Sequence, residues 1–156
     1  MKKILSMIAM LSIIVFAGKI TLLNQKAMDI VYHVPLKKFP RFICEAKLEN
    51  GKIIQFASVK SMIQAYFHQA YFLQKKIISA KIEDMYVQDF STGLAVNAKK
   101  AVYVFGSNIR QPNGDNLVPF KDIKSAKLFE KRYGGAAILK FKRISLSLIQ
   151  LLDMGP

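Results

Sequence analysis

The sequence has few of the residues from which enzymes usually build their sites. Its only histidines are His33 and His68, and no CxxC or HxxxH metal-binding spacing occurs. With so few imidazoles, no set of serine, histidine and carboxylate can be proposed. No glycine-rich phosphate loop follows an expected strand. The sequence therefore predicts a protein that is not an enzyme.

Acidic residues and cysteine are also scarce. Only 10 Asp and Glu oppose 24 Lys and Arg, which gives a net charge of +14. The scattered carboxylates argue against a carboxylate pair or a calcium loop, and the basic excess favours an acidic partner, a phospholipid surface or nucleic acid. Cys44 is the single cysteine, so no internal disulfide can form. A composition of 52% apolar and 22% charged residues is globular, and folding must rest on the apolar core.

The first 18 residues have the pattern of an export signal. Lys2 and Lys3 precede an uncharged run of 15 residues, 4–18, which is shorter than the roughly 20 residues that span a bilayer. We expect residues 1–18 to be a signal peptide or an N-terminal membrane anchor, and the protein to be periplasmic. Export argues against a nucleic-acid partner. Because Lys19 stands where a bacterial lipoprotein has its lipidated cysteine, we do not expect a typical lipoprotein.

Two segments 64 residues apart follow one pattern. Residues 56–62 (FASVKSM) and 120–126 (FKDIKSA) each place an aromatic residue two positions before a helix-capping residue, which is followed by a β-branched residue and Lys-Ser. Two apolar runs joined by a glycine-containing turn precede each segment, and a helix and a strand follow it. Neither half is long enough to bury a good core alone. The sequence thus predicts an α+β fold of two tandem strand-strand-helix-strand (ββαβ) units, about 42–90 and 98–142, that share one core.

Local patterns place the individual elements. The stretch 85–93 (MYVQDFSTG) is expected to be a strand entering a tight turn, at the seam between the two units. Residues 19–38 are expected to be a basic, extended and solvated lead, and residues 39–156 the folded domain. The predicted strands cover residues 42–48, 53–56, 77–87, 101–106, 117–120 and 136–141, with residues 94–98 as a short connector. The predicted helices cover residues 59–76, 123–133 and 145–152, with Ile123 on the buried side of the second, and the last is a short C-terminal helix.

The remaining chemistry is that of soft metal ligands. Seven methionines, two histidines and one cysteine in an exported protein would suit Cu(I), which prefers thioether, thiolate and imidazole donors. Met62 is expected on the buried face of the first helix, and Cys44 is expected to be a small buried hydrophobe. Met85 lies in a predicted strand beside Asp84, and for this residue both packing and metal binding stay open.

Segments spread along most of the chain resemble the NosL family in the same order. The matching segments are residues 38–42 (KFPRF), 50–52 (NGK), 56–62, 84–91 (DMYVQDFS), 98–107 (AKKAVYVFGS), 117–120 (LVPF) and 133–135 (YGG). NosL proteins are periplasmic, usually lipid-anchored accessory proteins that carry copper for nitrous-oxide reductase. The resemblance covers roughly residues 30 to 150 and implies a Cu(I) carrier or metallochaperone that serves a reductase maturation complex or transporter. It also implies a pair of strand-strand-helix-strand units, in agreement with the repeat.

The chain departs from the family at its copper motif. The family carries Cys-Gly-Met where residues 32–34 are Tyr-His-Val here. Met85 matches a methionine that the family carries before Tyr-Val, so the resemblance leaves Met85 as the first candidate Cu(I) ligand, with His33 and Met28 as substitutes. The alternative is a non-metal binding or assembly module of the same fold. Its basic surface would dock an acidic protein partner or an anionic membrane surface.

Overall fold

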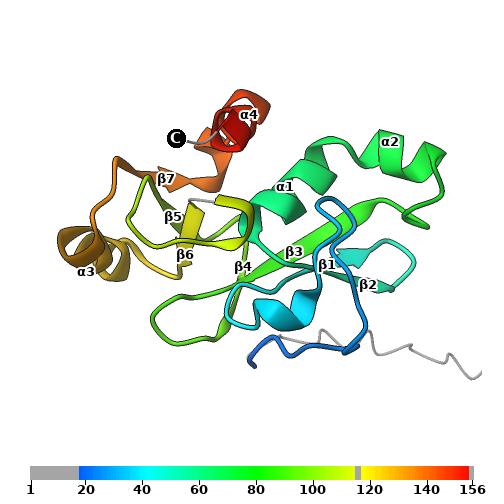
Figure 1. Ribbon diagram of the computed structural model, residues 1–156, viewed down its shortest axis with the longest axis horizontal. Helices are drawn as coiled ribbons and strands as arrows, with labels where there is room; N and C mark the ends of the chain where they lie inside the picture. Colours follow the sequence, from blue (N-terminus) through cyan, green and yellow to red (C-terminus); the bar gives the residue numbers. More distant parts are fainter. Residues whose placement is uncertain (1–17, 115–116, 155–156) are drawn as a thin grey trace, which may run out of the picture.

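The structure is a computed structural model that describes residues 18–114 and 117–154 (Figure 1). Apart from Gly18, the predicted export signal lies outside the described residues. The described chain forms two antiparallel sheets with helices between their strands and a short C-terminal helix, so the predicted α+β class is confirmed. Within this part of the chain, no helix combines the length and apolar character needed to cross a bilayer.

The first unit is a four-stranded sheet with the strand order β2-β1-β3-β4. Two consecutive helices connect β2 to β3, and α1 packs on the sheet. The elements are β1 (Cys44–Leu48), β2 (Ile53–Phe56), α1 (Val59–Phe67), α2 (Gln69–Gln74), β3 (Ile82–Gln88) and β4 (Ala95–Asn97). A short 3-10 turn, η1 (Leu36–Lys38), precedes them.

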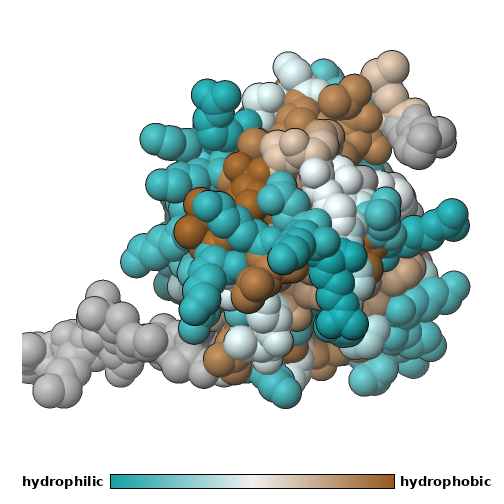
Figure 2. Space-filling view, turned by 90° about the vertical axis from the view of Figure 1, so that its left-hand side faces the viewer, coloured by the Kyte–Doolittle hydropathy of each residue, from teal (hydrophilic) through white to brown (hydrophobic). Residues whose placement is uncertain are grey.

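The second unit is a three-stranded sheet with the order β6-β5-β7. In Figure 1 its helix α3 lies at one end of the molecule, β2 and α2 lie at the other end, and α1 lies between them. The elements are β5 (Val102–Phe105), η2 (Pro112–Gly114), β6 (Leu117–Phe120), α3 (Ile123–Tyr133), β7 (Ala137–Lys140), η3 (Phe141–Arg143) and α4 (Leu146–Met154). Seen from the α3 end, apolar surface is framed by hydrophilic side chains (Figure 2).

The predicted duplication is confirmed by strand order and register. In each unit the first strand lies between the second and the strand that follows the helices, and β4 adds a fourth strand to the first sheet only. All neighbouring strands are antiparallel. Phe56 pairs with Cys44, the first residue of β1, and Phe120 pairs with Val102, the first residue of β5. Both phenylalanines are buried and lie just ahead of a helix. The repeated sequence pattern therefore encodes one supersecondary unit twice.

The helix caps show how the repeated segments produce the same local structure. Ser58 accepts a hydrogen bond from the Ser61 amide at 3.1 Å, and Asp122 accepts one from the Ser125 amide at 2.8 Å. Each cap satisfies an amide of the first helical turn that has no partner within the helix. The same backbone hydrogen bond lowers the pKa of Asp122 below its ordinary value.

The apolar interior consists of two clusters. The larger one joins both units, because α4 and residues of β5 and β6 pack with the first sheet and α1. Its buried members from residue 98 onward are Ala98, Ala101, Tyr103, Leu117, Ile144, Ile149 and Leu152. The smaller cluster lies between the second sheet and α3 and consists of Val102, Val104, Val118, Phe120, Ala126 and Phe129. The shared core of the prediction is thus the larger cluster.

Several elements differ from those predicted. The helix expected over 59–76 is divided at His68 into α1 and α2, and Phe72 of α2 is buried in the core while Tyr71 stays 53% exposed. Strand β3 begins at Ile82 rather than at residue 77 because α2 and a turn with Lys76 at φ +55° occupy the preceding residues. Residues 95–97, expected to be a connector, pair with β3 as β4. Ile123, expected on the buried side of α3, is exposed.

The segment 19–38 is not the solvated approach that its charge pattern suggested. Ile20, Asp29 and Leu36 are all buried, and the chain turns back on itself before η1. Its apolar side chains Ile30 and Val31 pack against the larger core cluster. The segment is therefore part of the folded structure.

Candidate functional site

Residues 27–36 form a narrow loop that carries two of the three predicted copper ligands. The amide of Asp29 donates to Val34 O at 2.9 Å, the amide of Leu36 donates to Ala27 O at 3.1 Å, and an isolated β-bridge joins Met28 to Pro35. These contacts close the loop like a hairpin. We call residues 27–36 the hairpin loop.

The carboxylate of Asp29 fixes the hairpin loop to the start of α1. It is fully buried and accepts hydrogen bonds from the amides of Val31 and Tyr32 at 2.8 and 2.9 Å. It also accepts from the amide of Ala57 at 2.7 Å, and the Ser61 hydroxyl lies within 2.7 Å of both carboxylate oxygens. A buried carboxylate is stable only with such donors around it, so Asp29 sets the position of the loop.

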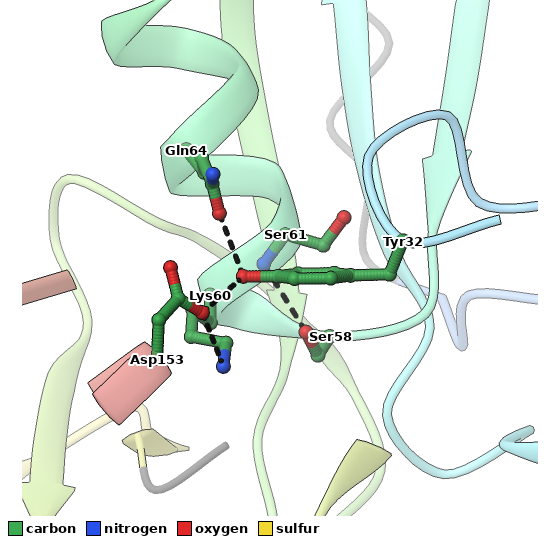
Figure 3. A network of polar contacts seen from close by, with 6 residues as sticks. All are labelled: Tyr32, Ser58, Lys60, Ser61, Gln64 and Asp153. Atoms are coloured by element: carbon green, nitrogen blue, oxygen red, sulfur yellow. Dashed lines mark hydrogen bonds and ion pairs between the residues drawn. The ribbon is translucent and has the colours of Figure 1, made fainter. Parts of the chain in front are cut away.

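A second polar network joins the loop to α1 and to the C-terminal helix α4 (Figure 3). The Tyr32 hydroxyl lies 2.6 Å from Gln64 Oε1 and 2.8 Å from Asp153 Oδ1. Lys60 is only 1% exposed, and its Nζ lies 2.9 Å from Asp153 Oδ1 and 5.0 Å from the centre of the Tyr32 ring. Tyr32 stands at the first position of the replaced Cys-Gly-Met motif. Its side chain therefore connects the hairpin loop to α1 and α4.

Met28 and His33 present their side chains at the surface of the hairpin loop. Met28 is 47% exposed and borders a hollow of about 230 Å³ that Leu36 and Ile54 also line. His33 is exposed, has a left-handed backbone with φ +55°, and donates its amide to Asp29 O at 3.0 Å. The loop thus offers one thioether and one imidazole to solvent on a fixed backbone.

Met85 lies elsewhere. It sits in β3 opposite Ala46, is 1% exposed, and packs in the larger core cluster together with Cys44 and Met62. The structure therefore does not place Met85 at the surface with Met28 and His33, although sequence reasoning named the three together. Among the described residues, the structure contains no group of three or more His, Cys, Asp or Glu side chains placed so that they could hold a metal ion together.

Glu45 is a buried carboxylate on β1 whose partner, Gln55, reaches the N-terminal segment. Gln55 donates from Nε2 to Glu45 Oε1 at 2.8 Å and to Thr21 O at 2.7 Å, and it accepts from the Leu23 amide at 2.9 Å. Within the described part of the chain, Glu45 Oε2 has no hydrogen-bond partner. Burial raises the pKa of Glu45 above its ordinary value of 4.5, and the hydrogen bond from Gln55 opposes this shift.

Replacing Glu45 with glutamine should stabilise the protein at neutral pH. Because the folded-state pKa of Glu45 is raised, the folded chain holds the proton more tightly, and the stability of the wild type falls as pH rises from 4.5 through the folded pKa. Glu45→Gln removes the buried charge and should raise the free energy of unfolding at pH 7 by about 1 kcal/mol, with a smaller gain at pH 4. Urea unfolding at both pH values measures this, and a loss of stability at pH 7 would contradict it.

Comparison with known proteins gives a family match and structural neighbours. The family model of NosL matches residues 21–149. The crystal structure of the copper chaperone NosL from Shewanella denitrificans is similar with a TM-score of 0.64 at 20% identity, over 83% of this chain and 98% of that chain. The solution NMR structure of the apo-NosL protein from Achromobacter cycloclastes has a TM-score of 0.46 at 24% identity, over 68% of this chain and 87% of that chain. No curated protein matches. The first likeness shows a shared fold.

Proposed function

The chain belongs to the NosL family, and on that premise we propose that it carries Cu(I) for the maturation of nitrous-oxide reductase. The observation that supports this most directly is the hairpin loop, where Met28 and His33 are both exposed on a backbone that Asp29 anchors. Thioether and imidazole are donors that Cu(I) accepts. In this proposal Met85 packs in the larger core cluster rather than binding the metal.

An exposed pair of donors suits a carrier. Two side chains at the surface leave the rest of the metal's coordination sphere open to the ligands of a receiving protein, so copper can pass from one protein to the other by ligand exchange. The fixed backbone keeps the two donors available without a large ordering cost. A resident cofactor, by contrast, is usually enclosed by more donors and by a second shell of hydrogen bonds.

We also propose that the protein acts in the periplasm, where it meets a reductase maturation complex or a transporter. The basic and apolar pattern of residues 1–18 supports export, with the segment either cleaved or retained as a tether. Alkaline phosphatase fused to the C-terminus would report this, since that enzyme is active only outside the cytoplasm. An inactive fusion would contradict the export proposal.

Removing either exposed donor should weaken copper binding. Met28→Ala and His33→Ala are each expected to lower the Cu(I) affinity by about tenfold or more. Met85→Leu conserves volume in the core and should change the affinity by less than about twofold. Competition between the full-length chain and a coloured Cu(I) chelator measures all three, with circular dichroism as the control for folding.

Two outcomes would overturn this assignment of ligands. One is a Met28→Ala/His33→Ala double variant that holds Cu(I) as tightly as the wild type. The other is a Met85→Leu variant that folds normally and loses copper, which would place the metal within the core cluster.

A second candidate function is a docking or assembly module that does not bind metal. It is favoured by the use of Tyr32 as a structural residue, because Tyr32 stands at the first position of the replaced Cys-Gly-Met motif and joins α1 and α4 instead. Such a module would capture its partner with or without copper and lose it in high salt, because charge would dominate the contact. Partner capture that requires copper would exclude this candidate.

A further inference from the structure

A cleft of about 510 Å³ opens at the seam between the two units. It lies between α3, the end of β6 and the turn that follows β3, at the end of the molecule shown in Figure 2. The residues that determine its chemistry are Arg41, Phe90, Leu128, Phe129, Arg132 and Tyr133. We call this the seam cleft.

The floor of the seam cleft is a continuous row of aromatic rings. The ring centres of Phe90 and Phe129 are 5.1 Å apart, those of Phe120 and Phe129 are 5.1 Å apart, and those of Phe129 and Tyr133 are 4.9 Å apart. Phe120 and Phe129 are buried, whereas Phe90 and Tyr133 are only partly buried and face the opening. The exposed Leu128 adds apolar surface to the lining. Such a floor can accept an apolar or aromatic side chain of a ligand.

Two arginines flank this floor. The guanidinium of Arg41 lies 4.7 Å from the centre of the Phe90 ring, and that of Arg132 lies 5.2 Å from the centre of the Tyr133 ring. Stacking on a ring holds the guanidinium plane while its N–H groups can still donate to a carboxylate. Among the described residues, neither arginine forms an ion pair, and the lining of the cleft includes no acidic side chain. The seam cleft therefore combines apolar surface with positive charge that no neighbour neutralises.

The cleft is held rigidly by hydrogen bonds across the seam. Gln88 donates from Nε2 to Pro40 O at 2.9 Å and to Ile43 O at 3.1 Å, which fixes the backbone on both sides of Arg41. The amide of Phe90 donates to Pro119 O at 2.9 Å and so joins the turn after β3 directly to β6 of the second unit. A ligand would therefore lose little affinity to ordering the site.

A second hollow extends the cleft. It has a volume of about 390 Å³, shares Arg41, Phe90 and Ser91 with the seam cleft, and adds Lys19 at its edge. Its one carboxylate, Asp89, is buried and accepts hydrogen bonds from the amide of Ser91 and the hydroxyl of Thr92 in its own turn. The two hollows together give an elongated basic surface, which fits an extended chain better than a compact small molecule.

We propose that the seam cleft binds an acidic peptide segment of a partner protein. An apolar or aromatic side chain of the segment packs on the floor formed by Phe90, Phe129 and Tyr133, and carboxylates on either side of it pair with Arg41 and Arg132. A recessed aromatic floor favours a protruding segment over the flat surface of a bilayer. The proposal does not involve Met28 or His33, so its failure would leave the copper proposal intact.

A labelled acidic peptide tests this directly. Fluorescence anisotropy with the full-length chain and fluorescein-Asp-Glu-Phe-Glu-Asp should show saturable binding. The Arg41→Ala/Arg132→Ala variant should lower the affinity by about tenfold or more, and a peptide with serine in place of phenylalanine should bind comparably weakly. Lys124→Ala/Lys127→Ala is the matched control, because it removes the same charge from exposed positions of α3 that do not line the cleft. This control should change the affinity by less than about threefold.

Three results would overturn the proposal. The first is an absence of peptide binding, and the second is an equal loss in the arginine and lysine variants, which would indicate general charge attraction. The third comes from sedimentation with phosphatidylglycerol vesicles. If vesicle binding, rather than peptide binding, depends on Arg41 and Arg132, then the cleft recognises a membrane surface.

Discussion

Replacing Asp29 with alanine is expected to cost about 4 kcal/mol of the free energy of unfolding, which is a large part of the roughly 5–15 kcal/mol that stabilises a typical domain. The substitution removes the shared acceptor of the Val31, Tyr32 and Ala57 amides and of the Ser61 hydroxyl. The hydrogen bonds from Ala57 and Ser61 are buried, so losing their acceptor carries the desolvation cost of both donors, whereas water can partly replace it at the part-buried Val31 and Tyr32 amides. Urea unfolding followed by circular dichroism measures the loss.

Asp84→Ala is the matched control for Asp29→Ala. Asp84 lies on β3, is only partly buried, and is expected to change the free energy of unfolding by less than about 0.5 kcal/mol. An Asp29→Ala variant as stable as the Asp84→Ala variant would refute the role of Asp29. Asp29 should also affect copper binding through the position of the hairpin loop, without being a ligand itself.

The second large effect concerns the ion pair between Lys60 and Asp153. Asp153→Ala leaves the Lys60 ammonium buried beside the Tyr32 ring without its carboxylate, and it should cost about 2 kcal/mol. This value is below that for a fully buried pair because Asp153 is 38% exposed, so water can partly replace it. Thermal or urea unfolding of the variant measures the cost.

Lys60→Met provides the comparison that isolates the buried charge. Methionine has nearly the same length and fills the same space, so this variant should lie within about 1 kcal/mol of the wild type. The Lys60→Met/Asp153→Ala double variant should be more stable than Asp153→Ala alone. The opposite order would mean that the cost at Asp153 arises from its contact with Tyr32 and not from the buried charge.

The repeat made the fold predictable, since each half carries its own local signals. The capping residues Ser58 and Asp122 and the aromatic residues before them fix where each helix begins. The alternation of apolar residues fixes which strand faces are buried. Since both halves arrange their three repeated strands in the same order, one correct half predicts these strands of the other, although not the additional β4.

The same repeat hides what differs between the halves. In both α1 and α3 the first residue is followed by Lys-Ser. Yet Lys60 of α1 is buried in an ion pair, whereas Lys124 of α3 is exposed. Ser61 binds the carboxylate of Asp29, which is 32 residues away, and no periodic pattern marks such a contact. The role of Asp29 and the burial of Ile20 and Leu36 therefore depend on tertiary contacts that no local sequence pattern marks.

The candidate copper site was predictable in part. Residue chemistry and the family resemblance singled out Met28, His33 and Met85, and the structure places the first two on one loop. Met85 has the alternation of a buried strand residue, and its inward direction in β3 follows from that pattern. From the sequence, packing and metal binding both stay open for Met85, and the structure shows that its side chain packs in the core with 1% exposure.

The central claim is that the exposed donors of the hairpin loop hold the copper. X-ray absorption at the copper edge of the Cu(I)-loaded full-length chain tests it most directly, because sulfur and nitrogen ligands scatter differently. The account predicts both sulfur and nitrogen scattering in the wild type, with the sulfur contribution lost in Met28→Ala and the nitrogen contribution lost in His33→Ala. A sulfur ligand that persists in Met28→Ala and disappears in Met85→Leu would contradict it.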